Sequence, residues 1–559
     1  MYSPEITPSP LPTSTVPLGK PIDTAVEAEP PSYSPSVNTA ARMDDIEKGV
    51  YSDSKPNSID HPVRVAEHEE SNSFLRFLDR MNVASTKLES KLGMEVRGIE
   101  RVQEDQRTDN DISGSATIWL AANCVLSTFG IGILGPAIFG LGLGDSLLCI
   151  FFTNAATAIV PAYAATFGPK LGLRQMTSAR YAWGWHGAKI VALLNCIACV
   201  GWSAINTIAG AQALRVVADD KISHAAGIII IAFITLVVGL LGYKWVHRYE
   251  RYSWIPTAIT FIVLLGCGAK GLSNVPMATG EAAIGGCLSF IGTIFGFAMG
   301  WVSLASDYNV YQSAETSSLR VFSWTYGGLI FPLVLVEWLG AAIMCGALAN
   351  QEGTWYTEYL SNELGGLVGA VFRDHLGQGG TGFFLFLLVL SVVSNNIINV
   401  YSLGLSISVV HRYIARVPRI VWPVVITGIY IGIAIAGADS FASALENFMN
   451  VLGYWLSIFA MVVFEEHFIF RKGSFANYNA AESWNCPALL PVGYAALAAF
   501  CAGAAGAALG MSQVWFVGPI GGLIGEPGYG ADIGFELSGG FAGVVYPVAR
   551  YLELKYVGR

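Results

Sequence analysis

The chain has 559 residues, of which 53% are hydrophobic and only 13% are charged. An ordinary soluble protein carries about 25% charged residues, so this composition indicates an integral membrane protein. Residues 1–113 hold 12 Lys/Arg and 20 Asp/Glu, which is −8 of the net charge of −9. The acidic balance therefore belongs to the N-terminal segment, and nothing in it favours nucleic acid as a partner.

Residues 1–75 are rich in Pro, Ser, Thr and Glu and show no apolar periodicity. Such a composition cannot bury enough apolar surface to fold, and no signal-peptide apolar region follows Met1. We expect a disordered cytoplasmic tail. Its lysines and those just beyond it make ubiquitin ligase adaptors candidate partners; they are Lys48, Lys55, Lys87 and Lys91.

Residues 76–114 have a different character and are expected to form a cytoplasmic juxtamembrane segment. Apolar residues recur at loosely helical spacing, namely Phe77, Met81, Val83, Leu88, Leu92 and Val96. This pattern predicts a short amphipathic element at the membrane surface. A solvated, poorly ordered stretch is the alternative.

Residues 115–550 form the predicted transporter domain, followed by a short cytoplasmic C-terminus at 551–559. A helix needs about 20 apolar residues to cross a bilayer. Twelve segments meet this requirement, at 115–140, 144–166, 188–216, 226–243, 252–269, 284–305, 324–347, 381–405, 420–437, 441–462, 487–509 and 531–550. The sequence therefore predicts an all-α integral membrane protein with twelve transmembrane helices.

The loop charges predict the orientation of these helices. If the N-terminus is cytoplasmic, the cytoplasmic loops hold thirteen Lys/Arg and the outer loops hold four. Lys and Arg favour the cytoplasmic side of a membrane. Twelve crossings return the chain to the side where it began, so both termini are expected in the cytoplasm.

Two of the twelve segments are interrupted by glycine or proline. The interrupting residues are Gly130, Gly132, Gly135 and Pro136 in the first segment, and Gly292, Gly296 and Gly300 in the sixth. Interrupted segments at corresponding positions of two halves point to a transporter's substrate site. They predict two inverted five-helix repeats with helices 1 and 6 broken, plus two extra helices. Close helix packing through small residues is the alternative.

Polar and aromatic residues also occur inside the spans. Trp202 and Asn206 are four residues apart in the third span, as are Asn395 and Asn399 in the eighth, so each pair shares a helix face. Carboxamides donate and accept hydrogen bonds, and tryptophan rings stack on flat rings. Together they favour a site for a flat, neutral heterocycle. Interhelical hydrogen bonds and core packing are the alternatives.

The motifs EVRGIERV, STFGIGILGP, GWSAINT, GFAMGWVSLASDYNVY and VSNNIINVYSLGLS extend from about Glu95 to Ser406. In these the chain resembles the nucleobase–cation symporter-1 family, in its fungal purine–cytosine permease branch. The resemblance implies a plasma-membrane secondary transporter, without cofactor or enzymatic activity, that brings purine bases and cytosine into the cell together with a cation.

The resemblance also implies roles for single residues. It places Trp202 and Trp301 at the two ring-stacking positions of the family. It places the polar substrate contacts at Ser127, Asn206, Asn395 and Asn399.

The cation is expected to be a proton rather than sodium. The eighth span keeps Ser394, but Val393 stands where a second hydroxyl of a sodium site is expected. Glu337 lies near the centre of the seventh span, where a charged carboxylate is costly, and is the candidate proton carrier. Asp307 and Glu446 come next. A structural role for Glu337 is the alternative.

Two other functions remain open. The same family includes carriers of vitamin B6, so pyridoxine or another small heterocycle is an alternative substrate. A receptor that senses nutrients without transporting them is an alternative of a different class. An enzyme or a metal site would need clustered His, Cys or carboxylates inside the spans, and the histidines fall in loops or at span ends.

Overall fold

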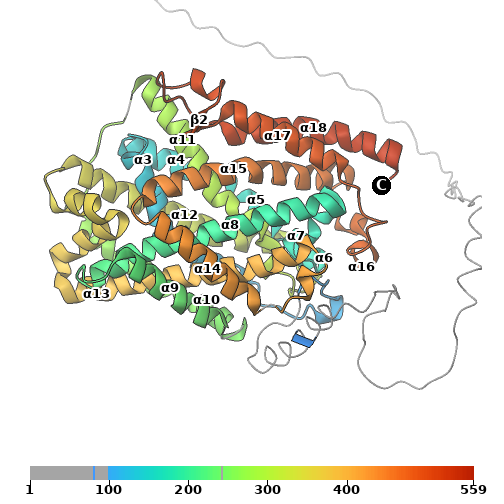
Figure 1. Ribbon diagram of the computed structural model, residues 1–559, viewed down its shortest axis with the longest axis horizontal. Helices are drawn as coiled ribbons and strands as arrows, with labels where there is room; N and C mark the ends of the chain where they lie inside the picture. The colour runs from blue at the N-terminus through green and yellow to red at the C-terminus, as the bar shows by residue number, and fades with distance from the viewer. Residues whose placement is uncertain (1–79, 82–97, 241–242, 278, 419) are drawn as a thin grey trace, which may run out of the picture. The chain divides into compact units, whose positions relative to one another are not determined.

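The computed structural model describes residues 80–81, 98–240, 243–277, 279–418 and 420–559 (Figure 1). The predicted tail at 1–75 lies outside the described residues, and so do residues 82–97 of the predicted amphipathic element.

The described chain is almost entirely helical (Figure 1). Its longer helices are α2 (Ser113–Asn123), α3 (Leu126–Ala137), α4 (Leu143–Thr157), α8 (Arg180–Val217), α9 (His224–Leu240), α10 (Tyr243–Gly268), α11 (Gly280–Met299), α12 (Ser318–Ala349), α13 (Thr354–Val410), α14 (Val421–Ala436), α15 (Phe441–Glu465), α17 (Tyr494–Gly510) and α18 (Gly534–Val557). The shorter elements are α5 (Ile159–Ala164), α6 (Phe167–Leu171), α7 (Gln175–Ser178), α16 (Ala480–Ser483), and the antiparallel strands β1 (Ser512–Gln513) and β2 (Phe516–Val517).

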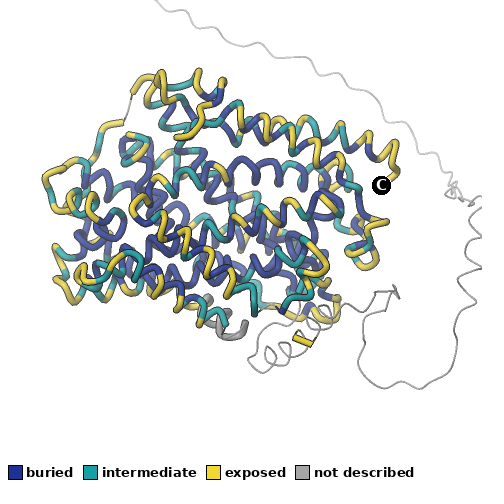
Figure 2. The backbone as a smooth tube through the Cα atoms, viewed as in Figure 1, coloured by how far each residue is buried: buried dark blue, intermediate teal, exposed yellow. Residues whose placement is uncertain are grey.

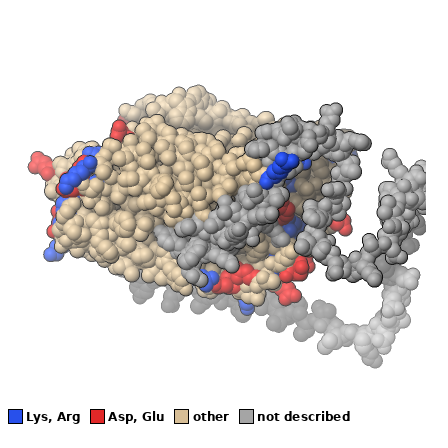
Figure 3. All heavy atoms as spheres, turned by 60° about the horizontal axis from the view of Figure 1, so that its bottom comes forward, with Lys and Arg blue, Asp and Glu red and all other residues tan. Residues whose placement is uncertain are grey.

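Every predicted span overlaps at least one of these helices, and the all-α architecture is confirmed. Among the described residues, six helices are long and apolar enough to cross a membrane, or seven if α2 and α3 count as one bent span. Three shorter apolar helices, α9, α14 and α17, accompany them. Figure 3 shows a broad uncharged area across the middle of one face, with charged side chains toward its left and lower right edges. The exact number of crossings stays a prediction.

The first span is broken earlier than its glycines predicted. α2 and α3 meet at an angle of 55°, and the non-helical residues are Cys124 (φ −81°, ψ 70°) and Val125 (φ −143°, ψ 157°). The hinge predicted in the glycine-rich stretch is therefore wrong, because that stretch lies inside α3; its residues are Gly130, Gly132, Gly135 and Pro136.

These glycines instead allow close helix packing, which was the alternative reading of the sequence. A Cβ atom on Gly132 would lie 1.9 Å from the carbonyl oxygen of Glu337 in α12, so the two backbones are in direct contact. In the sixth span, a Cβ on Gly296 would lie 1.9 Å from the carbonyl oxygen of Met449 in α15. Gly296 is therefore a packing residue and not a hinge.

The sixth span does change conformation at Gly300. α11 ends at Met299, and the chain continues as two short 3₁₀ turns, η3 (Gly300–Ser303) and η4 (Ala305–Tyr308). The eighth span forms the last part of α13, after a non-helical residue at Gly377. α8 packs along α13, and α12 packs along α3. Figure 2 shows that buried residues are concentrated in the helices at the centre of the structure.

Candidate functional site

The break between α2 and α3 is bridged by side chains. A helix end leaves carbonyl groups without partners, and in an apolar environment each unmade hydrogen bond is costly. The Asn395 side chain of α13 donates from Nδ2 to the carbonyl oxygen of Ala122, and Asn123 Nδ2 donates to that of Trp119 at 3.0 Å. Asn395 therefore holds the end of α2 against α13.

A connected hydrogen-bond network continues from Asn395. Ser127, in the first turn of α3, donates from Oγ to Asn206 Oδ1 of α8 at 2.7 Å. Asn206 Nδ2 donates to Asn395 Oδ1 at 2.7 Å, and Asn399 Nδ2 donates to the same oxygen at 2.9 Å. These four side chains are at most 3% exposed. We call them the carboxamide network; the structure brings all four predicted polar residues together.

Trp301 lies beside the same break. Its indole Nε1 donates to Asn123 Oδ1 at 2.9 Å, and its ring contacts Trp119 edge-on at a centroid distance of 5.4 Å. Tyr308 also contacts Trp119 edge-on, at a centroid distance of 5.9 Å. The sequence did not single out Trp119. Trp119 lies four residues before Asn123, and the same spacing between Trp202 and Asn206 had indicated Trp202 as a site residue.

Trp202 approaches from α8 at the start of η3. Its Nε1 lies 3.4 Å from where a Cβ on Gly300 would be, which is an ordinary van der Waals contact. The Trp202 ring is tilted against Phe297 at 5.2 Å and contacts Phe448 edge-on at 5.7 Å. Trp202 and Trp301 are thus gathered around Gly300, at the end of α11.

Two buried polar atoms near the network have no hydrogen-bond partner among the described residues. The first is Oγ1 of Thr128, the residue after Ser127 in α3. Asn396 Oδ1 is adjacent in sequence to Asn395, while its Nδ2 donates to Thr207 Oγ1 at 3.0 Å. Buried polar atoms are normally satisfied, so these two oxygen atoms are exceptions among the described residues.

Glu337 is fully buried and faces α4. Asn154 Nδ2 donates to Glu337 Oε2 at 2.8 Å, and Asn154 is fully buried as well. Glu337 Oε1 and Asn154 Oδ1 have no partner among the described residues. Asn154 was missed in the sequence, although a single Asn within an apolar span is a signal of its own.

The other predicted cation residues have different surroundings. Ser394 Oγ lies 3.3 Å from Ser253 Oγ of α10. A second hydroxyl is therefore present, but it comes from α10 and not from position 393 of the eighth span. Asp307 Oδ1 accepts from the backbone N–H of Gln175 at 2.8 Å. Glu446 Oε1 accepts from Asn450 Nδ2 at 3.3 Å. In the described parts of the chain, no group of three or more His, Cys, Asp or Glu is placed to hold a metal.

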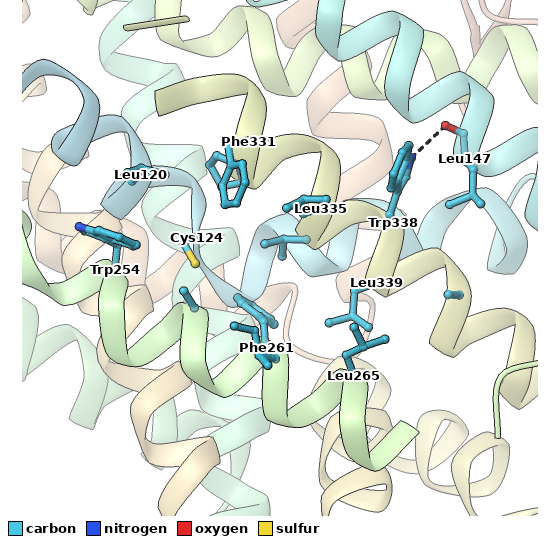
Figure 4. A pocket seen from close by; sticks show the side chains of 15 residues that line it. Leu120, Cys124, Leu147, Trp254, Phe261, Leu265, Phe331, Leu335, Trp338 and Leu339 are labelled. Carbon is cyan, nitrogen blue, oxygen red and sulfur yellow. Dashed lines mark hydrogen bonds between the residues drawn. The ribbon is translucent and has the colours of Figure 1, made fainter. Parts of the chain in front are cut away.

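An apolar groove of about 400 Å³ borders the break at Cys124 (Figure 4). It lies between α2, α4, α10 and α12. The labelled side chains in Figure 4 converge on it from these helices, and they are Leu120, Cys124, Leu147, Trp254, Phe261, Leu265, Phe331, Leu335, Trp338 and Leu339.

Comparison with known proteins identifies the family. The family of permeases for cytosine/purines, uracil, thiamine and allantoin matches residues 101–518. The chain belongs to this family. It is 44% identical over 476 residues to the purine-cytosine permease fcyB of Emericella nidulans, covering 85% of this chain and 91% of that protein. The purine-cytosine permease FCY2 of Saccharomyces cerevisiae is 40% identical, covering 84% and 88%.

A vitamin B6 transporter of Saccharomyces cerevisiae, TPN1, is 31% identical over 536 residues, covering 87% of this chain and 91% of that protein. Among solved structures, the nucleobase-cation-symport-1 family transporter Mhp1 in a closed conformation covers 82% of this chain and 95% of its own, with a TM-score of 0.60 and 16% identity. That likeness shows the fold. These relatives are named as permeases and transporters, which confirms that this protein is a multi-pass membrane transporter and not an enzyme.

Proposed function

We propose that this permease carries purine bases and cytosine into the cell, across the plasma membrane, together with a proton. The observation that carries the proposal is the carboxamide network at the helix break, flanked by Trp202 and Trp301. Donors and acceptors of this kind match the amide-like edges of a nucleobase. The names of the relatives at 44% and 40% identity support the same substrate class.

Binding is proposed to occur by exchange of hydrogen bonds within the network. Asn206 and Asn395 satisfy one another at 2.7 Å. A base that enters between α3, α8 and α13 would take over one of these hydrogen bonds and reach the unpartnered Thr128 Oγ1 or Asn396 Oδ1. The exchange keeps the buried groups satisfied, whereas a purely apolar ring would leave them unpaired, which costs about 1–3 kcal/mol per group.

The proton is proposed to bind at Glu337. As a carboxylate, Glu337 would be an ion buried in a membrane protein with one carboxamide donor, Asn154, and no counter-ion within the described residues. A proton on Oε1 removes that charge and gives Oε1 a hydrogen to donate. The Asn154 carboxamide already donates to Glu337 from Nδ2, and its Oδ1 has no partner among the described residues. A protonated Oε1 of Glu337 could donate to this Oδ1, and that one hydrogen bond would give both unpartnered atoms a partner.

Sodium is the less favoured cation. Ser394 and Ser253 offer two hydroxyl oxygens 3.3 Å apart, and no carboxylate of the described residues is hydrogen-bonded to them. Hard cations are generally held by more oxygen ligands than these two. If sodium drives uptake, this pair becomes the first place to mutate.

The deciding experiment is uptake of labelled cytosine, adenine, hypoxanthine and uracil in a yeast that lacks its own base transporters. We expect saturable uptake of cytosine and purines that a protonophore abolishes. Replacing sodium with choline should have no effect. Uptake that requires sodium would refute proton coupling while leaving base transport intact.

A second candidate substrate is vitamin B6, because TPN1 is 31% identical to this chain. Pyridoxine is also a flat heterocycle with polar substituents. Labelled pyridoxine uptake that unlabelled cytosine does not inhibit would favour this candidate. If purified protein binds a base but proteoliposomes show no flux, the receptor function applies instead.

We further propose that both termini are cytoplasmic, from the Lys/Arg balance of the loops. Residues 1–75 are then accessible to ubiquitin ligase adaptors. Protease protection of tags at each end in sealed vesicles tests this orientation.

A further inference from the structure

We propose that the apolar groove between α2, α4, α10 and α12 is a binding site for one acyl chain of a bilayer phospholipid. None of its lining residues belongs to the carboxamide network, Glu337 is not among them, and the site does not depend on which substrate is carried. It is defined by its volume of about 400 Å³ and by its walls (Figure 4).

The walls offer no hydrogen bond to an occupant. The two side chains with strong donors are tryptophans, and both donors are in use inside the protein. Trp338 Nε1 donates to the carbonyl oxygen of Leu147 at 3.0 Å, and Trp254 Nε1 donates to that of Arg251 at 3.1 Å. A ligand with a buried hydroxyl or amide would lose its own hydrogen bonds here, so the chemistry selects a hydrocarbon chain.

The mouth of the groove is continuous with the lipid-facing surface. Ile262 of α10 and Phe331 of α12 line it and are 68% and 60% exposed. In a multi-pass membrane protein, apolar side chains exposed on helix faces contact the hydrocarbon of the bilayer. The nearest available occupant is therefore an acyl chain of that bilayer, already in its apolar phase. A sterol fits less well, because its ring system carries a hydroxyl.

The floor of the groove is the helix break itself. Cys124, one of the two non-helical residues between α2 and α3, lines the groove and is 5% exposed. Phe261, also on the floor, stacks on Phe129 of α3 at a centroid distance of 6.2 Å. A chain in the groove would fill the space between α2 and the pair α10 and α12, and would so support the bent arrangement of the first span.

The test uses the full chain in proteoliposomes that contain a phospholipid with a photoactivatable group along its acyl chain. We expect cross-links on groove residues, read by mass spectrometry. Ala258→Trp, which fills the groove from α10, should reduce these cross-links to background. Ile259→Trp is the matched control, because Ile259 is the next residue on the same helix, is 52% exposed, and does not line the groove.

Ala342→Trp fills the groove from α12. It is a second filling variant, so the test does not depend on the correct folding of Ala258→Trp alone. Both filling variants are compared with the control for thermal stability and for cross-links elsewhere on the apolar surface. Groove cross-links that persist in both folded filling variants would overturn the proposal. So would labelling of the groove by a photoactivatable sterol that excess phospholipid does not reduce.

Discussion

Asn206 is the residue whose removal tests the candidate site most directly. Its Oδ1 accepts from Ser127 and its Nδ2 donates to Asn395, each at 2.7 Å, and the side chain is fully buried. Asn206→Ala removes both hydrogen bonds and the carboxamide proposed to meet the base. Loss of one such contact with an unpaired partner costs about 1–3 kcal/mol, which is about 5- to 150-fold in affinity.

The same helix supplies a matched control. Asn195 of α8 is also buried, donates to Ser406 Oγ at 2.8 Å and accepts from Ser303 Oγ at 2.6 Å. Asn195→Ala therefore removes as many hydrogen bonds as Asn206→Ala, but it leaves the carboxamide network intact. Any loss of stability should be similar in the two variants, so only a loss of affinity separates binding from folding.

The assay is binding of labelled cytosine to purified protein, alongside uptake in cells with equal amounts of transporter at the surface. We expect a large increase in Kd and in KM for Asn206→Ala and values close to wild type for Asn195→Ala. Equal affinity loss in both variants would mean that the carboxamides only pack the helices. Normal affinity in Asn206→Ala would refute the site altogether.

Three further predictions concern the rings, the carboxyl group and the tail. Trp202→Phe and Trp301→Phe should keep measurable uptake because a ring face remains, whereas both Ala variants should lose it; unchanged KM in the Ala variants would make the rings packing residues. Wild-type uptake should fall steeply as external pH is raised at fixed sodium, and Glu337→Gln should flatten this response. A full pH response in that variant would move the proton carrier to Asp307 or Glu446. Deletion of residues 1–75 should lengthen the lifetime of the protein at the membrane without changing KM, and a large KM shift would reveal a gate in the tail.

The sequence predicted the helices and the shared helix face of Asn395 and Asn399 for the same reason: both are short-range patterns. A run of apolar residues long enough to cross a bilayer has few other structures available to it. The spacing of four residues between Asn395 and Asn399 places both side chains on one face, and the structure joins them at 2.9 Å. Patterns of this kind need no knowledge of the rest of the chain.

The break could not be placed from local signals. It occurs at Cys124 and Val125, where no glycine or proline is present, while Gly132 and its neighbours stay helical. Position 132 must be glycine because the backbone of Glu337, about 200 residues later in the chain, lies where a Cβ would be. In the same way, Asn154 is 183 residues from Glu337, and only the packing of α4 on α12 reveals the pair.

α3 connects the two proposed sites physically. Ser127 in its first turn joins the carboxamide network, and Gly132, further along the helix, lies against the backbone of Glu337. Gly340 strengthens this contact, since a Cβ there would lie 2.1 Å from the carbonyl oxygen of Phe129. With a glycine on each helix at this contact, the two backbones touch directly, and a shift of one is expected to displace the other. A proton at Glu337 and a base at Ser127, as proposed, would therefore act on one closely packed pair of helices, which is a direct route to the coupling that the proposed symport requires.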